Sequence, residues 1–155
     1  MSKSKKPVFA CVVSSWNEGV TGGLLRGAKA YLEEQGMPLK EEHIFSAPGA
    51  FELPLIAEKI ARTGKFDGVI TLGCVIKGET AHFEYISLGV TQGTMMATLN
   101  SGVPIAFGVI TTYTAEQAER RAQNDDFNKG REAASACLAS VKTLRQVKAL
   151  KSGKK

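Results

Sequence analysis

Short apolar runs alternate along the chain with longer segments in which apolar residues recur at helical spacing. The runs are typical of buried strands, and one of them is weaker than the others. They lie at residues 8–14, 43–46 (the weaker one), 66–72 and 104–110. The segments of helical spacing are 21–35, the stretch from Phe51 to Gly64, 83–100, a short helix opened by the capping box at Thr114, and 128–147.

This alternation of strands and helices predicts one α/β fold. Strands separated by helices of about ten or more residues pair in parallel and carry helices on both faces of the sheet. Ligands of such folds bind beyond the carboxyl ends of the strands. We therefore expect a binding site where the strands end, which places it near Trp16, the segment 47–52, the segment 73–82 and Thr111-Thr112.

Composition sets the size and the charge of this unit. With 155 residues, 43% apolar and 23% charged, the chain is long enough for one core and too short for two domains. We expect a single domain over residues 8–147, between disordered basic tails at 1–7 and 148–155. The net charge of +5 comes from the lysines of the two tails, so the rest of the chain is nearly neutral. Since no RNA-binding or recognition-helix pattern accompanies the charge, we expect no nucleic-acid partner.

The sequence also argues against a membrane, a disulfide framework and a metal. No apolar run reaches the roughly 20 residues that span a bilayer, and residues 1–7 lack a secretory apolar stretch, so we expect a cytoplasmic protein. Cys11, Cys74 and Cys137 lie among apolar or small residues, which is typical of reduced core thiols. The two histidines are far apart, and the nucleotide phosphate fingerprints are absent. A small-molecule site remains.

His82 is the first candidate for chemistry, because it follows a predicted strand that stops at small and polar residues. A lone histidine there often only caps the next helix, but its neighbours favour a site. Lys77 and Thr80 can meet an anion, and Glu84 could orient the imidazole. Trp16 fits two roles equally, as a ring packed in the core or as an exposed ring that stacks on a planar ligand.

Five motifs occur in order and with matching spacing between about Val8 and Leu144. They are Pro48-Gly-Ala-Phe-Glu-Leu-Pro54, Gly73-Cys-Val-Ile-Lys-Gly-Glu-Thr-Ala-His-Phe-Glu-Tyr85, Gly102-Val-Pro-Ile-Ala-Phe-Gly-Val-Ile-Thr-Thr112, Glu116-Gln-Ala-Glu-Arg-Arg121 and Asn128-Lys-Gly130. Together they resemble the 6,7-dimethyl-8-ribityllumazine synthase family, which acts at the penultimate step of riboflavin synthesis. Five motifs in register are a far more specific signal than any one of them.

The resemblance implies a fold, an assembly and a reaction. The fold is a flavodoxin-like three-layer sandwich with a four-stranded parallel sheet flanked by helices. Active sites lie between neighbouring subunits of a homopentamer, which in some members assembles into decamers or icosahedral shells. The family condenses two small-molecule substrates, 5-amino-6-(D-ribitylamino)uracil and 3,4-dihydroxy-2-butanone 4-phosphate, and releases phosphate and water without a metal or a cofactor. Two alternatives are a non-catalytic lumazine- or flavin-binding paralogue, which could dispense with His82 and Arg121, and a shell-forming structural protein.

Carried over residue by residue, the resemblance implies three groups of site residues. His82 matches the catalytic histidine. The residues that contact the pyrimidine or the ribityl chain are Trp16, Ala50, Phe51, Glu52, the strand end Cys74, Val75 and Ile76, and a neighbouring subunit's Phe107. The residues that contact the butanone phosphate are Glu79 through its backbone amide, Thr80, and a neighbouring subunit's Arg121, with Lys129 in support.

One segment departs from the family pattern. Between Arg121 and Asn128 the chain reads Ala-Gln-Asn-Asp-Asp-Phe, where relatives usually carry a glycine-rich segment with a lysine. Asp125 and Asp126 are therefore expected to lie near the phosphate and to repel it, an effect that salt screens over about 8–10 Å.

Overall fold

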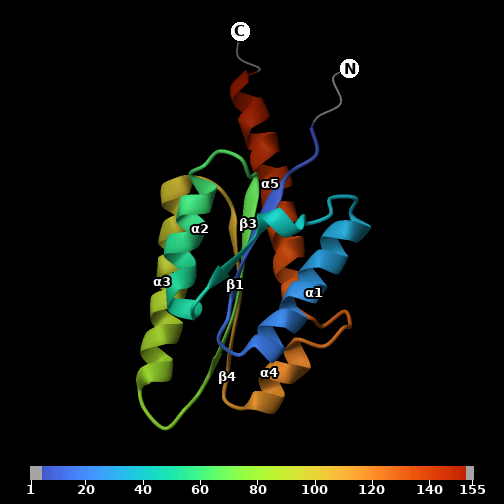
Figure 1. Cartoon of the computed structure of the whole chain (residues 1–155). Coiled ribbons are helices and arrows are strands. Elements are labelled where there is room, and N and C mark those ends of the chain that lie inside the picture. Colours follow the sequence, from blue (N-terminus) through green and yellow to red (C-terminus); the bar gives the residue numbers. More distant parts are fainter. Residues whose placement is uncertain (1–4, 153–155) are drawn as a thin grey trace.

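The computed structural model describes residues 5–152, which form a four-stranded parallel sheet with helices on both faces (Figure 1). Cys11 pairs with Ile44 in one parallel ladder and Val69 with Ile105 in another. The short strand β2, predicted only weakly, lies at one edge of the sheet, where two of its four side chains are exposed. The order of the strands is β2 (Ile44–Ala47), β1 (Phe9–Ser14), β3 (Gly68–Ile76) and β4 (Ile105–Thr112).

Among the described residues, two helices cover one face of the sheet and three cover the other (Figure 1). The first face carries α2 (Leu53–Ala61) and α3 (His82–Ser101). The opposite face carries α1 (Glu18–Glu34), α4 (Ala115–Arg121) and α5 (Lys129–Ser152). Two single 3₁₀ turns, Glu41–His43 and Ala50–Glu52, precede β2 and α2. The predicted three-layer α/β arrangement is confirmed.

Strand β3 is longer than the sequence predicts. The apolar run was expected to end at Leu72, yet the strand continues to Ile76, because β4 pairs with it over the added length and sets Ile76 opposite Thr112. Two strands that end together bring the residues after Ile76 and those after Thr112 to the same edge of the sheet.

Helix α5 is also longer than predicted. It extends to Ser152, so residues 148–152 are helical, although they were expected to belong to a disordered tail. At the other end, residues 5–7 form no helix or strand, but Arg145 donates a hydrogen bond to the Lys5 carbonyl at 2.8 Å. The remaining tail residues, 1–4 and 153–155, lie outside the described residues.

The core consists of two layers, one on each face of the sheet. Val69 and Ile70 are consecutive in β3 and both fully buried, Val69 in the layer under α2 and α3 and Ile70 in the layer under α1 and α5. A strand covered on both faces reads as a continuous apolar run rather than as an alternating one, which is why β3 was recognisable in the sequence.

Helices α1 and α5 approach each other closely through glycines. A Cβ on Gly27 would overlap the Asn128 side chain, and a Cβ on Gly130 would overlap the Leu24 carbonyl oxygen. The buried Asn128 amide donates to the carbonyls of Gly23 at 3.1 Å and Gln123 at 2.8 Å. Its oxygen accepts from the Gly130 amide at 2.9 Å, so the side chain is satisfied at the start of α5.

Replacing Gly130 by alanine is expected to lower the free energy of unfolding by about 1–3 kcal/mol, because the α1 backbone must move to admit the methyl group. The matched control is Gly19→Ala in α1, where a Cβ would meet nothing within 4 Å. Alanine favours a helix over glycine by about 1 kcal/mol, so this control should keep or raise the melting temperature. An unchanged melting temperature of Gly130→Ala would contradict the close approach of the two helices.

Candidate active site

A cavity of about 620 Å³ lies at the carboxyl ends of β1, β2 and β3, where the sequence predicts a ligand site. We call it the His82 cavity. Its walls come from the loop after β1, the segment after β2, the end of β3 and the first turns of α3. Its predicted site residues are Trp16, Ala50, Phe51, Glu52, Cys74, Val75, Ile76, Thr80 and His82, and it also contains Asn17, Pro48, Gly49, Gly78, Phe83 and Ile86.

Two aromatic rings in this cavity are open to solvent. Trp16 is 73% exposed and Phe51 is 59% exposed, so core packing is excluded as the role of the tryptophan in the isolated chain. The loop that carries Trp16 is fixed to the exit of β2, because the Ser15 amide donates to the Ala47 carbonyl at 2.8 Å and the Trp16 amide to the Pro48 carbonyl at 3.2 Å. A flat ring held on a fixed backbone is suited to stacking on a planar heterocycle.

Asn17 is a cavity residue that the sequence interpretation did not assign. Its φ of 61° is the left-handed conformation, which asparagine tolerates better than most residues, and it stands directly before α1. The Asn17 side-chain amide donates to the Cys74 carbonyl at 3.1 Å, which ties the β1 loop to the end of β3. Its position at a strand exit was the available signal. Since the Cys74 carbonyl already accepts this bond, Val75 and Ile76 supply the other backbone groups that can meet a ligand at the end of β3.

Two further unassigned cavity residues, Phe83 and Ile86, come from α3. Phe83 follows His82 directly in the motif, and Ile86 lies four residues after His82, on the same face of the helix. Helical spacing from His82 was therefore the signal that could have found Ile86.

Glu52 is held in the cavity wall by its own turn. One carboxylate oxygen accepts a hydrogen bond from the Gly49 amide at 3.0 Å, so the side chain folds back over the 3₁₀ turn that opens α2. This contact fixes the carboxylate where hydroxyl groups of a ligand can donate to it.

His82 is the first residue of α3 and is exposed in the cavity. Its backbone amide lies 3.4 Å from the Thr80 hydroxyl, and within the described residues its imidazole has no hydrogen-bond or ion-pair partner. The expectation that Glu84 orients this imidazole is not met, since the Glu84 carboxylate pairs with the Lys77 ammonium at 2.9 Å. Glu79 is exposed and does not line the cavity, while Gly78 and Thr80 of the same turn do.

Phe107 and Arg121 line a different cavity of about 310 Å³ against β4, α4 and α5, together with Lys129. Phe107 is 43% exposed, so it is not a core residue. The Arg121 guanidinium donates to the Gln117 carbonyl at 2.9 Å. Within one chain, these residues and His82 therefore belong to separate cavities.

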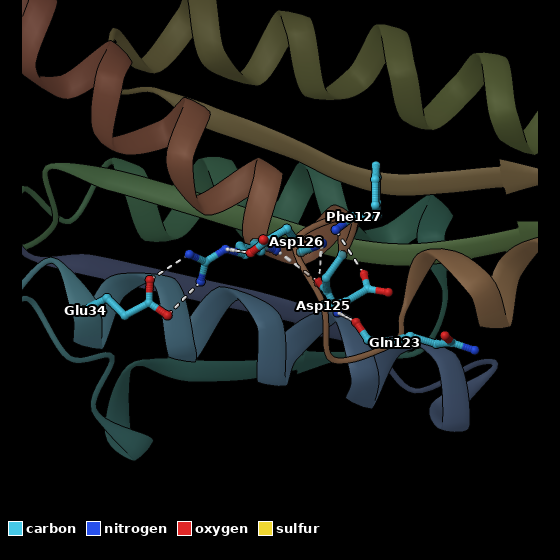
Figure 2. Close-up of polar contacts among 8 residues, drawn as sticks. Glu34, Gln123, Asp125, Asp126 and Phe127 are labelled. Atoms are coloured by element: carbon cyan, nitrogen blue, oxygen red, sulfur yellow. Dashed lines mark hydrogen bonds and ion pairs between the residues drawn. The ribbon is translucent and has the colours of Figure 1, made fainter.

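Both acids of the segment after Arg121 pair with the protein's own arginines. Figure 2 shows Asp125 and Asp126 in this segment, with the hydrogen bond between Asp125 and the Phe127 amide. The Asp125 carboxylate pairs with Arg120 at 2.7 Å and accepts from the Phe127 amide at 2.9 Å. Asp126 lies 3.8 Å from the guanidinium of Arg131, which also holds Glu34. Neither aspartate lines the cavity of about 310 Å³ that contains Phe107 and Arg121. Since each aspartate has a cationic partner, we expect the two acids to repel a bound phosphate less strongly than the sequence alone predicted.

The Cys74 thiol should be slow to react, although it lines the His82 cavity. Burial raises the pKa of Cys74 to about 11, since the thiolate loses its hydration there. At pH 8 nearly every Cys74 thiol is therefore protonated, and the protonated thiol is not the nucleophile. A colourimetric disulfide reagent at pH 8 should therefore titrate no thiol rapidly in the native protein and all three after denaturation. Rapid loss of one native thiol, mapped to Cys74, would contradict this environment.

Two kinds of feature are absent from the described residues. No helix in that part of the chain is long and apolar enough to cross a membrane. No group of three or more histidine, cysteine, aspartate or glutamate side chains is placed there to hold a metal ion.

The fold defines a parallel α/β protein with a cavity of ligand size at the carboxyl ends of its strands. Residues 6–145 match the family model described as 6,7-dimethyl-8-ribityllumazine synthase. The chain is 56% identical over 148 residues to 6,7-dimethyl-8-ribityllumazine synthase 1 of Caulobacter vibrioides, which covers 96% of this chain and 97% of that protein. It is 49% identical over 130 residues to the 6,7-dimethyl-8-ribityllumazine synthase of Salinibacter ruber, and this match covers 84% of this chain and 83% of that protein. The chain belongs to the 6,7-dimethyl-8-ribityllumazine synthase family and is a transferase of riboflavin biosynthesis.

Proposed function

We propose that this chain condenses 5-amino-6-(D-ribitylamino)uracil with 3,4-dihydroxy-2-butanone 4-phosphate in a site built from two subunits. One subunit supplies the His82 cavity, and its neighbour supplies Phe107 and Arg121. Two separate cavities on one chain carry this proposal. His82 and all the predicted pyrimidine and ribityl residues except Phe107 line one cavity, and Phe107 and the predicted phosphate arginine, Arg121, line the other. A neighbour that presents its second cavity to the first would complete the site.

In this arrangement the pyrimidine stacks on Trp16, and its ribityl hydroxyls donate to Glu52. The phosphate lies at the turn of Gly78 and Thr80, where the amino-terminal end of the 20-residue helix α3 favours an anion. The guanidinium of the neighbour's Arg121 completes its coordination by paired hydrogen bonds.

The chemistry needs a group that takes up and returns protons. The 5-amino group attacks the ketone, the resulting carbinolamine loses water, and phosphate then leaves. The departure of phosphate from C4 takes the proton from C3 and leaves an enol, whose tautomer carries a new carbonyl at C3. The ribityl-bearing nitrogen attacks this new carbonyl, and a second water departs as the ring closes. The imidazole of His82, which has no hydrogen-bond partner among the described residues, can serve each of these transfers, since an imidazole can both accept and donate a proton. Alignment of two reactants is worth roughly 7–11 kcal/mol, so positioning contributes more than proton transfer.

Self-association is part of the proposal, and two surfaces support it. Helix α3 exposes Leu88, Met95, Met96 and Leu99, each by more than half, in the described chain. A further cavity of about 620 Å³ with apolar lining, including Leu99, lies between α3, β4 and α5. Apolar patches of this kind mark protein interfaces. We propose that the chain forms a homopentamer, which is also the unit from which larger assemblies of the family are built. Sedimentation of the purified protein measures the stoichiometry.

A cytoplasmic location is also proposed, and the three free, buried thiols Cys11, Cys74 and Cys137 support it. The test of the function itself is direct. Purified protein incubated with both substrates should release phosphate and form a product with the absorbance and fluorescence of a lumazine. Binding of lumazine without its formation would favour a non-catalytic paralogue, and assembly without binding would favour a structural shell protein.

A further inference from the structure

An ion pair closes the base of the turn to which the proposed function assigns the phosphate. Lys77 follows the last residue of β3, and Glu84 lies in the first turn of α3. The Lys77 ammonium is 2.9 Å from a Glu84 carboxylate oxygen. Residues 78–81, which are exposed, span the gap between them. The pair therefore connects the two ends of the turn.

Two aromatic rings and the neighbouring strand fix the lysine. Its ammonium lies 5.9 Å from the Phe83 ring centroid and 5.7 Å from that of Tyr113, within the range of cation–π attraction. The two ring centroids are 6.1 Å apart. The Lys77 amide donates to the Thr112 carbonyl at 2.9 Å, so the base of the turn is anchored to the end of β4.

The same contacts argue against Lys77 as a direct phosphate ligand. Gly78, Thr80, His82 and Phe83 line the His82 cavity, but Lys77 does not. The hydrogen bond with Glu84 raises the pKa of Lys77, and the reciprocal bond lowers the pKa of Glu84. Both groups therefore stay charged at neutral pH, and each neutralises the other.

We propose that Lys77 and Glu84 act as a clasp, a pair of positioning residues that hold the phosphate-binding turn in shape without touching the phosphate. This inference rests on the proposed function. Loss of either charge loosens the turn, so the Michaelis constant for the butanone phosphate should rise, while that for the pyrimidine, which meets other walls of the cavity, should not.

The test compares Lys77→Met, Glu84→Gln and the double variant with the parent. Each single substitution is expected to raise the Michaelis constant for the butanone phosphate about two- to fivefold, the range of an exposed ion pair, and to change kcat by less than about twofold. The double variant should be no worse than either single one, because the clasp is already open. Glu58→Gln is the matched control, since it breaks the ion pair at 2.8 Å between Glu58 of α2 and Arg62, which follows that helix, away from the turn.

A fall in the Michaelis constant for the butanone phosphate in Glu84→Gln would overturn the clasp. If Lys77 binds phosphate directly, Glu84→Gln frees the ammonium and lowers the Michaelis constant, whereas Lys77→Met raises it more than about tenfold. No change in either variant would also overturn the proposal.

Calorimetric titration with inorganic phosphate separates this inference from the proposed function. If the parent binds phosphate but forms no lumazine, the proposed function fails, and the clasp is judged by phosphate affinity, which should weaken equally in both single variants. If the parent forms lumazine and the variants bind phosphate as the parent does, the clasp alone fails.

Discussion

Replacing His82 by alanine is expected to lower turnover by about 10²–10³ while both substrates still bind, because alignment survives the loss of proton transfer. The imidazole is exposed in the cavity and has no partner among the described residues, so no other protein group limits its exchange of protons with a substrate. Steady-state formation of the lumazine measures turnover, and titration of the pyrimidine against the variant measures binding.

The second histidine is the control. His43 packs edge-on against Phe66, with ring centroids 5.0 Å apart, and does not line the cavity. His43→Ala should retain parental turnover. Equal turnover of His82→Ala and the parent would remove the assigned role, and loss of pyrimidine binding in His82→Ala would show that the substitution damages the cavity itself.

Mixed oligomers of Arg121→Ala and His82→Ala subunits are expected to recover activity that neither variant has alone. In a head-to-tail ring, each site takes His82 from one subunit and Arg121 from the next. With equal and random mixing, one interface in four unites two intact residues, so activity should return to about a quarter of the parent's. Co-expression with two different affinity tags yields the mixed oligomers to be assayed.

A mixture of His82→Ala with the double variant His82→Ala/Arg121→Ala serves as the negative control, because no subunit in it has an intact His82. Absence of recovery in the first mixture, with mixed oligomers verified, would place both residues in the site of a single subunit and refute the shared site.

The sequence predicted the architecture well where local pattern and tertiary packing agree. β3 was recognisable because both of its faces are covered, but its last residues were missed, since Gly73 looks like a strand end until pairing with β4 is known. Residues 148–152 were assigned to a tail from their lysines, yet Ala149 and Leu150 favour a helix and α5 simply continues.

The site was predictable in its location and less so in its contacts. His82 and Glu84 are two residues apart, and residues at that spacing on a helix do not face each other. The expected contact required an extended backbone, whereas α3 already begins at His82. The partner of Glu84 is Lys77, which lies across a turn, and the spacing of apolar residues in the sequence does not predict such a contact. The two cavities divide the motif residues as the family resemblance implied, with Phe107 and Arg121 apart from His82, although sequence order alone does not encode distance.

The exposure of Trp16 gives the protein an optical probe of its own. It is the single tryptophan of the chain, and its ring lies open in the wall of the His82 cavity. Emission excited at the tryptophan band therefore reports from this one position, and a heterocycle that stacks on the indole would quench it. Occupancy of the cavity can then be followed without a label, in variants that cannot turn over, and at each step as subunits are mixed.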